Sequence, residues 1–236
     1  MALAGRVTGS RALGALVLFE LRRRWHGHRL WIAILLVGLA VFLLGIFVRT
    51  HLMYFSDAKD IYHSVYVVTL ALVFRFEVAH DMDLGFADFM SPNFVRVSTY
   101  LQARMAAGLA ALVQFALVAF VLTALAPGFS LRFAAWSTAF WLLLGLFFAP
   151  FVALSELWLR TRLPVIVVAL FAMILMFLGL TGGFYDGLVR ALGASQAVTG
   201  SFASLGALAW RAALVGFGGL ALVQPVTRRH WGPERG

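Results

Sequence analysis

Six apolar stretches, separated by charged or Gly/Pro-containing breaks, most constrain what this chain can fold into. They cover residues 30–48, 61–79, 101–126, 133–154, 163–181 and 205–226. Each approaches or exceeds the roughly 20 helical residues that cross a bilayer, and irregular backbone is not stable in lipid. With 62% hydrophobic and 12% charged residues, the chain lacks the polar cover of a soluble fold. The sequence therefore predicts an all-α polytopic membrane protein with six transmembrane helices.

The basic residues predict how these helices are oriented. The chain carries 19 Lys and Arg, with Lys59 the only lysine, and a net charge of +9. If the N-terminus is cytoplasmic, most of them collect on the cytoplasmic side, as the positive-inside rule requires. Their positions favour membrane lipid headgroups over nucleic acid as partners. This bias toward the cytoplasmic side predicts that both termini are in the cytoplasm. Sparse Lys with abundant Ala and Arg is compatible with a high-GC bacterium, and we expect a multi-pass protein of the bacterial inner membrane.

Three regions are expected along the chain. Residues 1–29 combine a short apolar run with six arginines. This pattern predicts a helix in the cytoplasmic membrane interface, whose long Arg side chains reach lipid phosphates. A cleavable signal peptide fits poorly, because the apolar run precedes most of the arginines. Residues 30–226 would form the transmembrane domain, and residues 227–236 a cytoplasmic tail.

A polar segment at residues 80–104, HDMDLGFADFMSPNFVRVSTYLQAR, lies between the second and third apolar stretches. So many charges need water, and the predicted topology places them in the cytoplasm. Gly85 and Pro92 predict a short helix followed by a turn. Aspartates favour the N-terminus of such a helix, and its apolar side chains would contact a partner: Leu84, Phe86, Phe89 and Met90. The alternative is a solvated loop without a partner.

Two charged pairs fall near the ends of predicted spans. Arg75 and Glu77 lie close to the inner end of the second span. They either reach water by extending along the helix or form a charged gate at the cytoplasmic mouth between subunits. Glu156 and Arg160 have the i, i+4 spacing and order of a helical ion pair, for which a structural role is expected.

The remaining polar and small residues predict no catalytic or metal site. The chain has no cysteine, so thiolate metal sites and cysteine nucleophiles are excluded. His63 lies within a span and is expected to be a hydrogen-bonded structural residue, and no GxSxG elbow occurs. We therefore expect no enzyme activity and no cofactor in this chain. Gly216, Gly218 and Gly219 in the last stretch suggest a close-packed seam between subunits.

Taken in order, these features resemble a known family. Glu20, Leu21 and Arg22 begin the basic end of the N-terminal helix. Further along, acidic residues on both sides of a glycine are followed by a proline, an arginine and then a basic residue where the chain re-enters the membrane. The residues of this pattern are Asp81, Asp83, Gly85, Asp88, Met90, Pro92, Arg96 and Arg104. The order and spacing are similar to the membrane (permease) subunits of type-2 ABC exporters. Phe86 replaces the family's usual Thr, Asp replaces Glu, and Ala103-Arg104 replaces Gly-Lys.

The resemblance implies a function for the polar segment. In that family it is the coupling helix, which docks on a cytoplasmic ATPase. The residues that would carry this contact are Asp81, Asp83, Gly85, Phe86, Asp88, Phe89, Pro92 and Arg96. The implied assembly pairs this chain with a second permease subunit, identical or not, and with two ABC ATPase subunits. No GxxxxGK[ST] motif occurs, so ATP hydrolysis is expected in a partner.

Two other functions remain open at this point. A membrane subunit of a cytochrome-c maturation exporter has similar size and topology. A non-transport scaffold or assembly subunit of a larger membrane complex would use the Gly- and Ala-rich helix faces to pack against other membrane chains. A neighbouring gene that encodes an ATPase would favour the exporter. Purification of the chain within a membrane complex that lacks any nucleotide-binding subunit would favour the scaffold.

Overall fold

The structure, a computed structural model, describes residues 9–73, 76, 97–159 and 205–231. All regular structure in these residues is helical. The six helices are α1 Gly9–His26, α2 His28–Arg49, α3 Phe55–Val73, α6 Val97–Leu125, α7 Leu131–Leu159 and α10 Gly206–Trp231. The predicted all-α class is therefore confirmed for the described residues.

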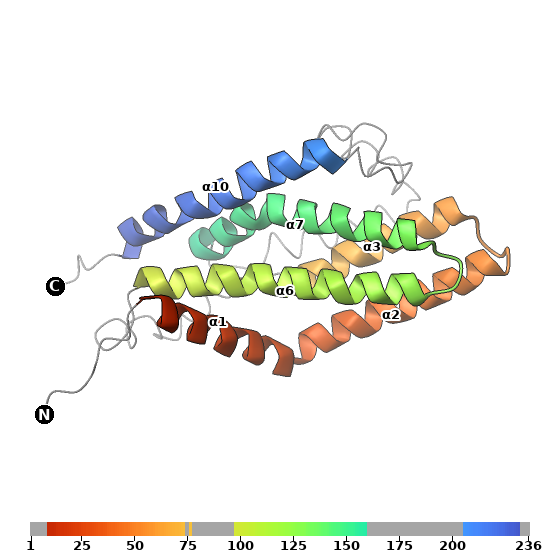
Figure 1. Ribbon diagram of the computed structural model, residues 1–236, viewed down its shortest axis with the longest axis horizontal. Coiled ribbons are helices and arrows are strands. Elements are labelled where there is room, and N and C mark those ends of the chain that lie inside the picture. The colour runs from red at the N-terminus through yellow and green to blue at the C-terminus, as the bar shows by residue number, and fades with distance from the viewer. Residues whose placement is uncertain (1–8, 74–75, 77–96, 160–204, 232–236) are drawn as a thin grey trace, which may run out of the picture.

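The helices form an elongated bundle with α6 running along its middle (Figure 1). α1 packs against the first part of α6, and α2 packs against α6 and α3. On its other side α6 contacts α7, and α7 packs against α10. The beginning of α1 and the end of α10 lie toward the same end of the bundle (Figure 1).

Three of the helices are long and apolar enough to cross a membrane, and they indicate a multi-pass membrane protein. The segments that meet this criterion of length and composition are His28–Arg49, Thr99–Leu125 and Leu131–Glu156. α3 falls short because its first turns carry Asp57, Lys59 and Asp60, and the apolar part of α10 is the shorter segment Leu208–Val223. The predicted span at 163–181 lies outside the described residues. The described part of the chain therefore supports three of the six predicted spans.

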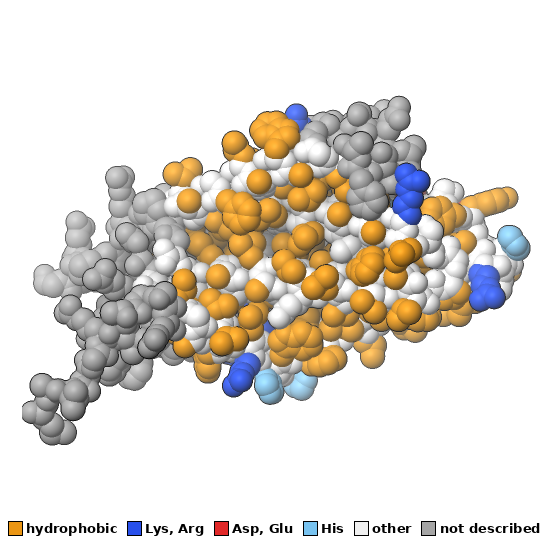
Figure 2. Space-filling view, viewed as in Figure 1, with side chains coloured by type: hydrophobic (Ala, Val, Ile, Leu, Met, Phe, Trp, Pro, Cys, Tyr) orange, Lys and Arg blue, Asp and Glu red, His pale blue; other side chains and the backbone are white. Residues whose placement is uncertain are grey.

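The outward face of α2 is apolar from Trp31 to Phe47. Exposed large side chains recur along it: Trp31, Ile32, Leu35, Leu36, Leu39, Phe42, Leu43, Ile46 and Phe47. The same kind of surface covers much of the visible face of the bundle (Figure 2). Because apolar patches of this extent are unfavourable in water, this face is built to lie in lipid or against another membrane helix.

Glycine allows α2 to meet the α6–α7 turn. Gly128 in this turn has φ +84°, a conformation that favours glycine, and a Cβ there would lie 2.6 Å from the carbonyl oxygen of Gly45. A Cβ on Gly45 would in turn collide with the carbonyl of Pro127. Only paired glycines permit this approach, which closes one end of the bundle.

The glycines of α10 serve packing within the chain. A Cβ on Gly216 would lie 2.6 Å from the carbonyl oxygen of Leu146, and one on Gly219 would lie 2.7 Å from the ring of Pro150, both on α7. Gly218 has open space around it. The expectation of an intersubunit seam is therefore wrong for Gly216 and Gly219, because α7 of the same chain already occupies that face.

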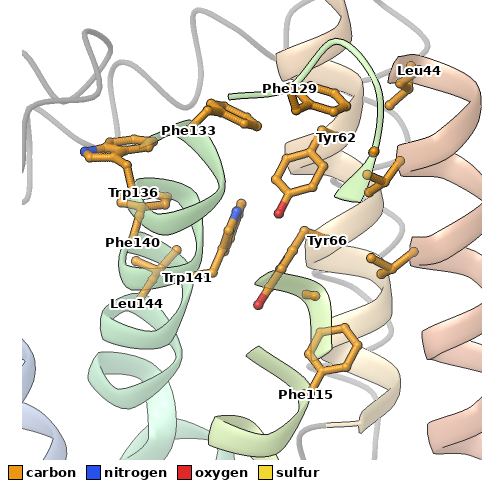
Figure 3. Packing of buried hydrophobic residues seen from close by; sticks show 14 of the residues in the cluster. Leu44, Tyr62, Tyr66, Phe115, Phe129, Phe133, Trp136, Phe140, Trp141 and Leu144 are labelled. Carbon is orange, nitrogen blue, oxygen red and sulfur yellow. The ribbon is translucent and has the colours of Figure 1, made fainter. Parts of the chain in front are cut away.

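An aromatic cluster fills the space between α3, α6 and α7 (Figure 3). Its members are Tyr62, Tyr66, Phe115, Phe129, Phe133, Trp136, Phe140 and Trp141, all buried. Tyr66 stacks on Trp141 with ring centroids 5.2 Å apart and planes 13° apart. Aromatic pairs add about 0.5–1.5 kcal/mol each beyond the area they bury, so this cluster is a rigid centre for the bundle.

Candidate functional site

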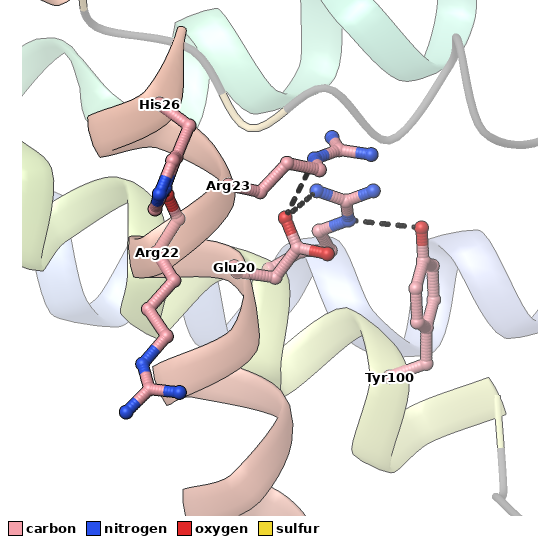
Figure 4. Close-up of polar contacts among 6 residues, drawn as sticks. Glu20, Arg22, Arg23, His26 and Tyr100 are labelled. Carbon is pink, nitrogen blue, oxygen red and sulfur yellow. Dashed lines mark hydrogen bonds and ion pairs between the residues drawn. The ribbon is translucent and has the colours of Figure 1, made fainter.

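A buried ion pair joins α1 to α6. Glu20 on α1 is 4% exposed and Arg104 on α6 is 1% exposed, and the Arg104 guanidinium donates a hydrogen bond to the Glu20 carboxylate. Arg104 Nε also donates to the Tyr100 hydroxyl at 2.9 Å. The Arg23 Nε lies 3.4 Å from the same carboxylate oxygen of Glu20. Figure 4 shows two guanidinium groups meeting at the Glu20 carboxylate, and one of them also reaching the Tyr100 hydroxyl.

Local helix geometry places each member of this pair. Tyr100 and Arg104 are one helical turn apart on α6, so they share a face, and the guanidinium carbon lies 5.4 Å from the Tyr100 ring centroid. Glu20 and Arg23 share a face of α1 in the same way. Two charges this deeply buried are tolerable only when they are paired. The pair therefore fixes how α1 sits along the beginning of α6.

A second buried carboxylate holds the chain just beyond α3. Glu156 on α7 is buried, and its Oε1 accepts a hydrogen bond from the backbone N–H of Phe76 at 3.1 Å. Phe76 itself is fully buried in a cluster with Tyr100 and Leu101 of α6 and with Ala153 of α7. Because α3 ends at Val73, this contact fastens the chain that follows α3 to α7.

The two carboxylates bracket residues 77–96, which include the part of the polar segment that precedes α6. Phe76 immediately precedes residues 77–96, and α6 with Arg104 immediately follows them. Glu156 holds the preceding side to α7, and Glu20 holds the following side to α1. Each side of residues 77–96 is therefore held by a buried carboxylate on another helix.

The predicted site residues themselves lie outside the described residues. This holds for the coupling set, Asp81, Asp83, Gly85, Phe86, Asp88, Phe89, Pro92 and Arg96, and for the candidate gate, Arg75 and Glu77. Their roles remain predictions. Two residues that carry the family resemblance, Glu20 and Arg104, are described, and the structure brings them into direct contact across 84 positions of sequence.

Neither buried contact, Glu20 with Arg104 or Glu156 with the Phe76 amide, was predicted from the sequence; these two contacts are called the anchors below. From the sequence, Glu20 is only part of the family signature. Glu156 is expected to pair with Arg160, and this pairing stays a prediction because Arg160 lies outside the described residues. One signal was present: Glu20 is the only acidic residue before Asp57, in a helix with an apolar run. A lone carboxylate in such a helix needs a buried cationic partner. The sequence alone does not say which arginine supplies it.

The buried histidine has a structural role, as predicted. Trp141 Nε1 donates to His63 Nδ1 at 3.0 Å, and both side chains are buried. Nearby, the Thr123 hydroxyl donates to the Tyr62 hydroxyl at 3.4 Å. Among the described residues no group of three or more His, Asp or Glu could hold a metal ion. This network joins α3, α6 and α7 and offers no reactive pair.

No protein-family model, curated protein or solved structure matches this chain. The resemblance to type-2 ABC permeases thus remains a prediction carried by the residues themselves. The geometry on which a function can be built is the pair of buried anchors around the polar segment.

Proposed function

We propose that this chain is the membrane subunit of an ABC-type exporter, and that residues 80–104 carry the contact with a cytoplasmic ATPase. The observation that supports this most is the buried Glu20–Arg104 pair, which holds the end of that segment inside the bundle. A plain solvated loop needs no charged anchor inside the bundle. A segment that transmits force needs a stiff attachment, and a paired, desolvated arginine provides one.

In this proposal, motion would enter through the polar segment and divide between two routes. One route passes through Arg104 to Glu20 and α1. The other passes through Phe76 to Glu156 on α7, against which α10 is packed. Tilting these helices together would open the bundle alternately to each side. The partner ATPase would supply the free energy, and the substrate would leave on the outer side.

Co-purification tests this function. The tagged full-length chain, extracted from its own membranes in a mild detergent, should retain a protein with a GxxxxGK[ST] motif in near-stoichiometric amount. An unrelated multi-pass protein carrying the same tag is the control. If the chain instead purifies with membrane proteins among which no nucleotide-binding subunit is found, the exporter proposal fails and a scaffold role replaces it.

A further inference from the structure

The bend between α1 and α2 exposes a group of basic side chains. Arg22 and His26 lie on the last turns of α1, His28 and Arg29 begin α2, and all four are exposed. The only acidic residue of the two helices, Glu20, is buried and paired with Arg104. Figure 4 shows Arg22 pointing away from the Glu20 carboxylate. The outer surface of this bend, here called the elbow, is therefore positively charged.

The elbow is held in one shape. Gly27 alone separates the two helices, with φ −76° and ψ 131°. Trp31 Nε1 donates to the carbonyl oxygen of Trp25 at 2.9 Å, and the two indole rings meet edge to face at 5.7 Å. Trp25 Nε1 in turn donates to Gln114 Oε1 on α6 at 3.1 Å. The basic side chains thus stand on a preformed support.

The backbone adds to the positive potential. Carbonyls at the end of α1 are satisfied, since Arg22 O accepts from His26 Nδ1 at 2.7 Å and Arg24 O accepts from Gly27 N at 3.1 Å. At the beginning of α2, by contrast, the N-cap Gly27 provides no side-chain cap for the first N–H groups. Uncapped N–H groups at a helix N-terminus attract anions. The elbow therefore combines side-chain and backbone donors.

Apolar surface adjoins the charge on both helices. On α1, Leu18 is 63% exposed and Phe19 58% exposed, and on α2 the exposed apolar face begins at Trp31. In Figure 2, Lys/Arg and His side chains gather along the edge where α1 meets α2, beside this apolar surface. α2 has 22 residues and is about 33 Å long, close to the hydrocarbon thickness of about 30 Å. Because exposed charges are costly in hydrocarbon, the elbow would lie at headgroup depth, and the part of α6 before Gln114 would then extend beyond the hydrocarbon.

From this arrangement we propose that the elbow binds the headgroup phosphate of an anionic phospholipid. Arg22 and His28 would contact the phosphate together with the first N–H groups of α2, while the acyl chains lie along the outer face of α2. A soluble phosphate would use the charge alone, whereas a lipid uses both the charge and the adjoining apolar surface. This site does not depend on the ATPase proposal.

Native mass spectrometry of the full-length chain from mixed phosphatidylglycerol and phosphatidylcholine micelles tests the site. Wild type should retain phosphatidylglycerol in preference to phosphatidylcholine. R22Q/H28Q should lower the retained phosphatidylglycerol about fivefold or more, since one Arg charge near an anionic surface contributes about that factor and the His28 hydrogen bond is lost as well. The matched control is R49Q/H51Q, which removes an exposed Arg and His at the other end of α2 and should change retention less than twofold.

A charge-conserving variant and a competition with free phosphate complete the test. R22K/H28K, which places a positive charge at both positions, should retain the lipid, so that a loss caused by misfolding is recognised. Millimolar inorganic phosphate should not displace the bound lipid. Equal losses in R22Q/H28Q and R49Q/H51Q, no loss in either, or displacement by free phosphate would each overturn the proposed lipid site.

Discussion

Replacing Arg104 with methionine should lower the free energy of unfolding by about 3 kcal/mol, because it leaves the Glu20 carboxylate buried without its main partner. Breaking a buried ion pair from one side typically costs about 3–5 kcal/mol. We expect the lower end, since Arg23 stays 3.4 Å from the same carboxylate oxygen and its side chain is 39% exposed. The measurement is the thermal unfolding midpoint of the purified chain in detergent.

The double variant E20Q/R104M separates the pair from the packing around it. With both charges removed, no unpaired charge stays buried, so most of the lost stability should return. R49M, at an exposed position on α2, is the matched control and should change stability by less than about 0.5 kcal/mol. If R104M behaves like R49M, the pair does not hold α1 to α6.

Reversing two charges in the polar segment should release the ATPase. We expect D83R/D88R to lower the amount of co-purified ATPase more than tenfold. Each surface ion pair contributes up to about 1 kcal/mol, and reversal adds repulsion, so two positions together exceed the 1.4 kcal/mol that corresponds to tenfold. The ratio of ATPase to permease, measured by quantitative mass spectrometry, is the readout.

Asp57 provides the control for this reversal. It is exposed at the beginning of α3, in the half of the bundle away from α1. D57R should leave the ratio of ATPase to permease unchanged. An equal loss in D57R would mean that the ATPase responds to net charge or to general destabilisation. Full retention in D83R/D88R would mean that these aspartates are not part of the contact.

The long apolar helices could be predicted from sequence, because lipid leaves the backbone no alternative to helix. The predicted stretch 30–48 matches α2, and 101–126 and 133–154 lie within or nearly within α6 and α7. Apolarity marks the part of a helix that suits lipid, not where the helix ends. For this reason α3 begins at Phe55, in polar sequence before the predicted 61, and α10 continues to Trp231, into the predicted tail.

The anchors could not be predicted in the same way. Glu20 and Arg104 are 84 positions apart, and the Phe76 amide and Glu156 are 80 apart. Which distant groups meet depends on how the helices are arranged, and no periodicity within one stretch contains that information. What the sequence did indicate was a polar segment that a folded bundle has to accommodate, and the structure adds that both of its flanks are fastened by buried carboxylates.

Cross-linking from a single cysteine tests the central claim most directly. The chain contains no cysteine, so D88C introduces one thiol whose product is unambiguous. With a short thiol-reactive cross-linker applied in native membranes, D88C should be joined to a protein carrying a GxxxxGK[ST] motif, and S56C, at the exposed beginning of α3, should not. If D88C is joined only to lipid-embedded neighbours without such a motif, or to the same proteins as S56C, the polar segment is not the docking point of an ATPase.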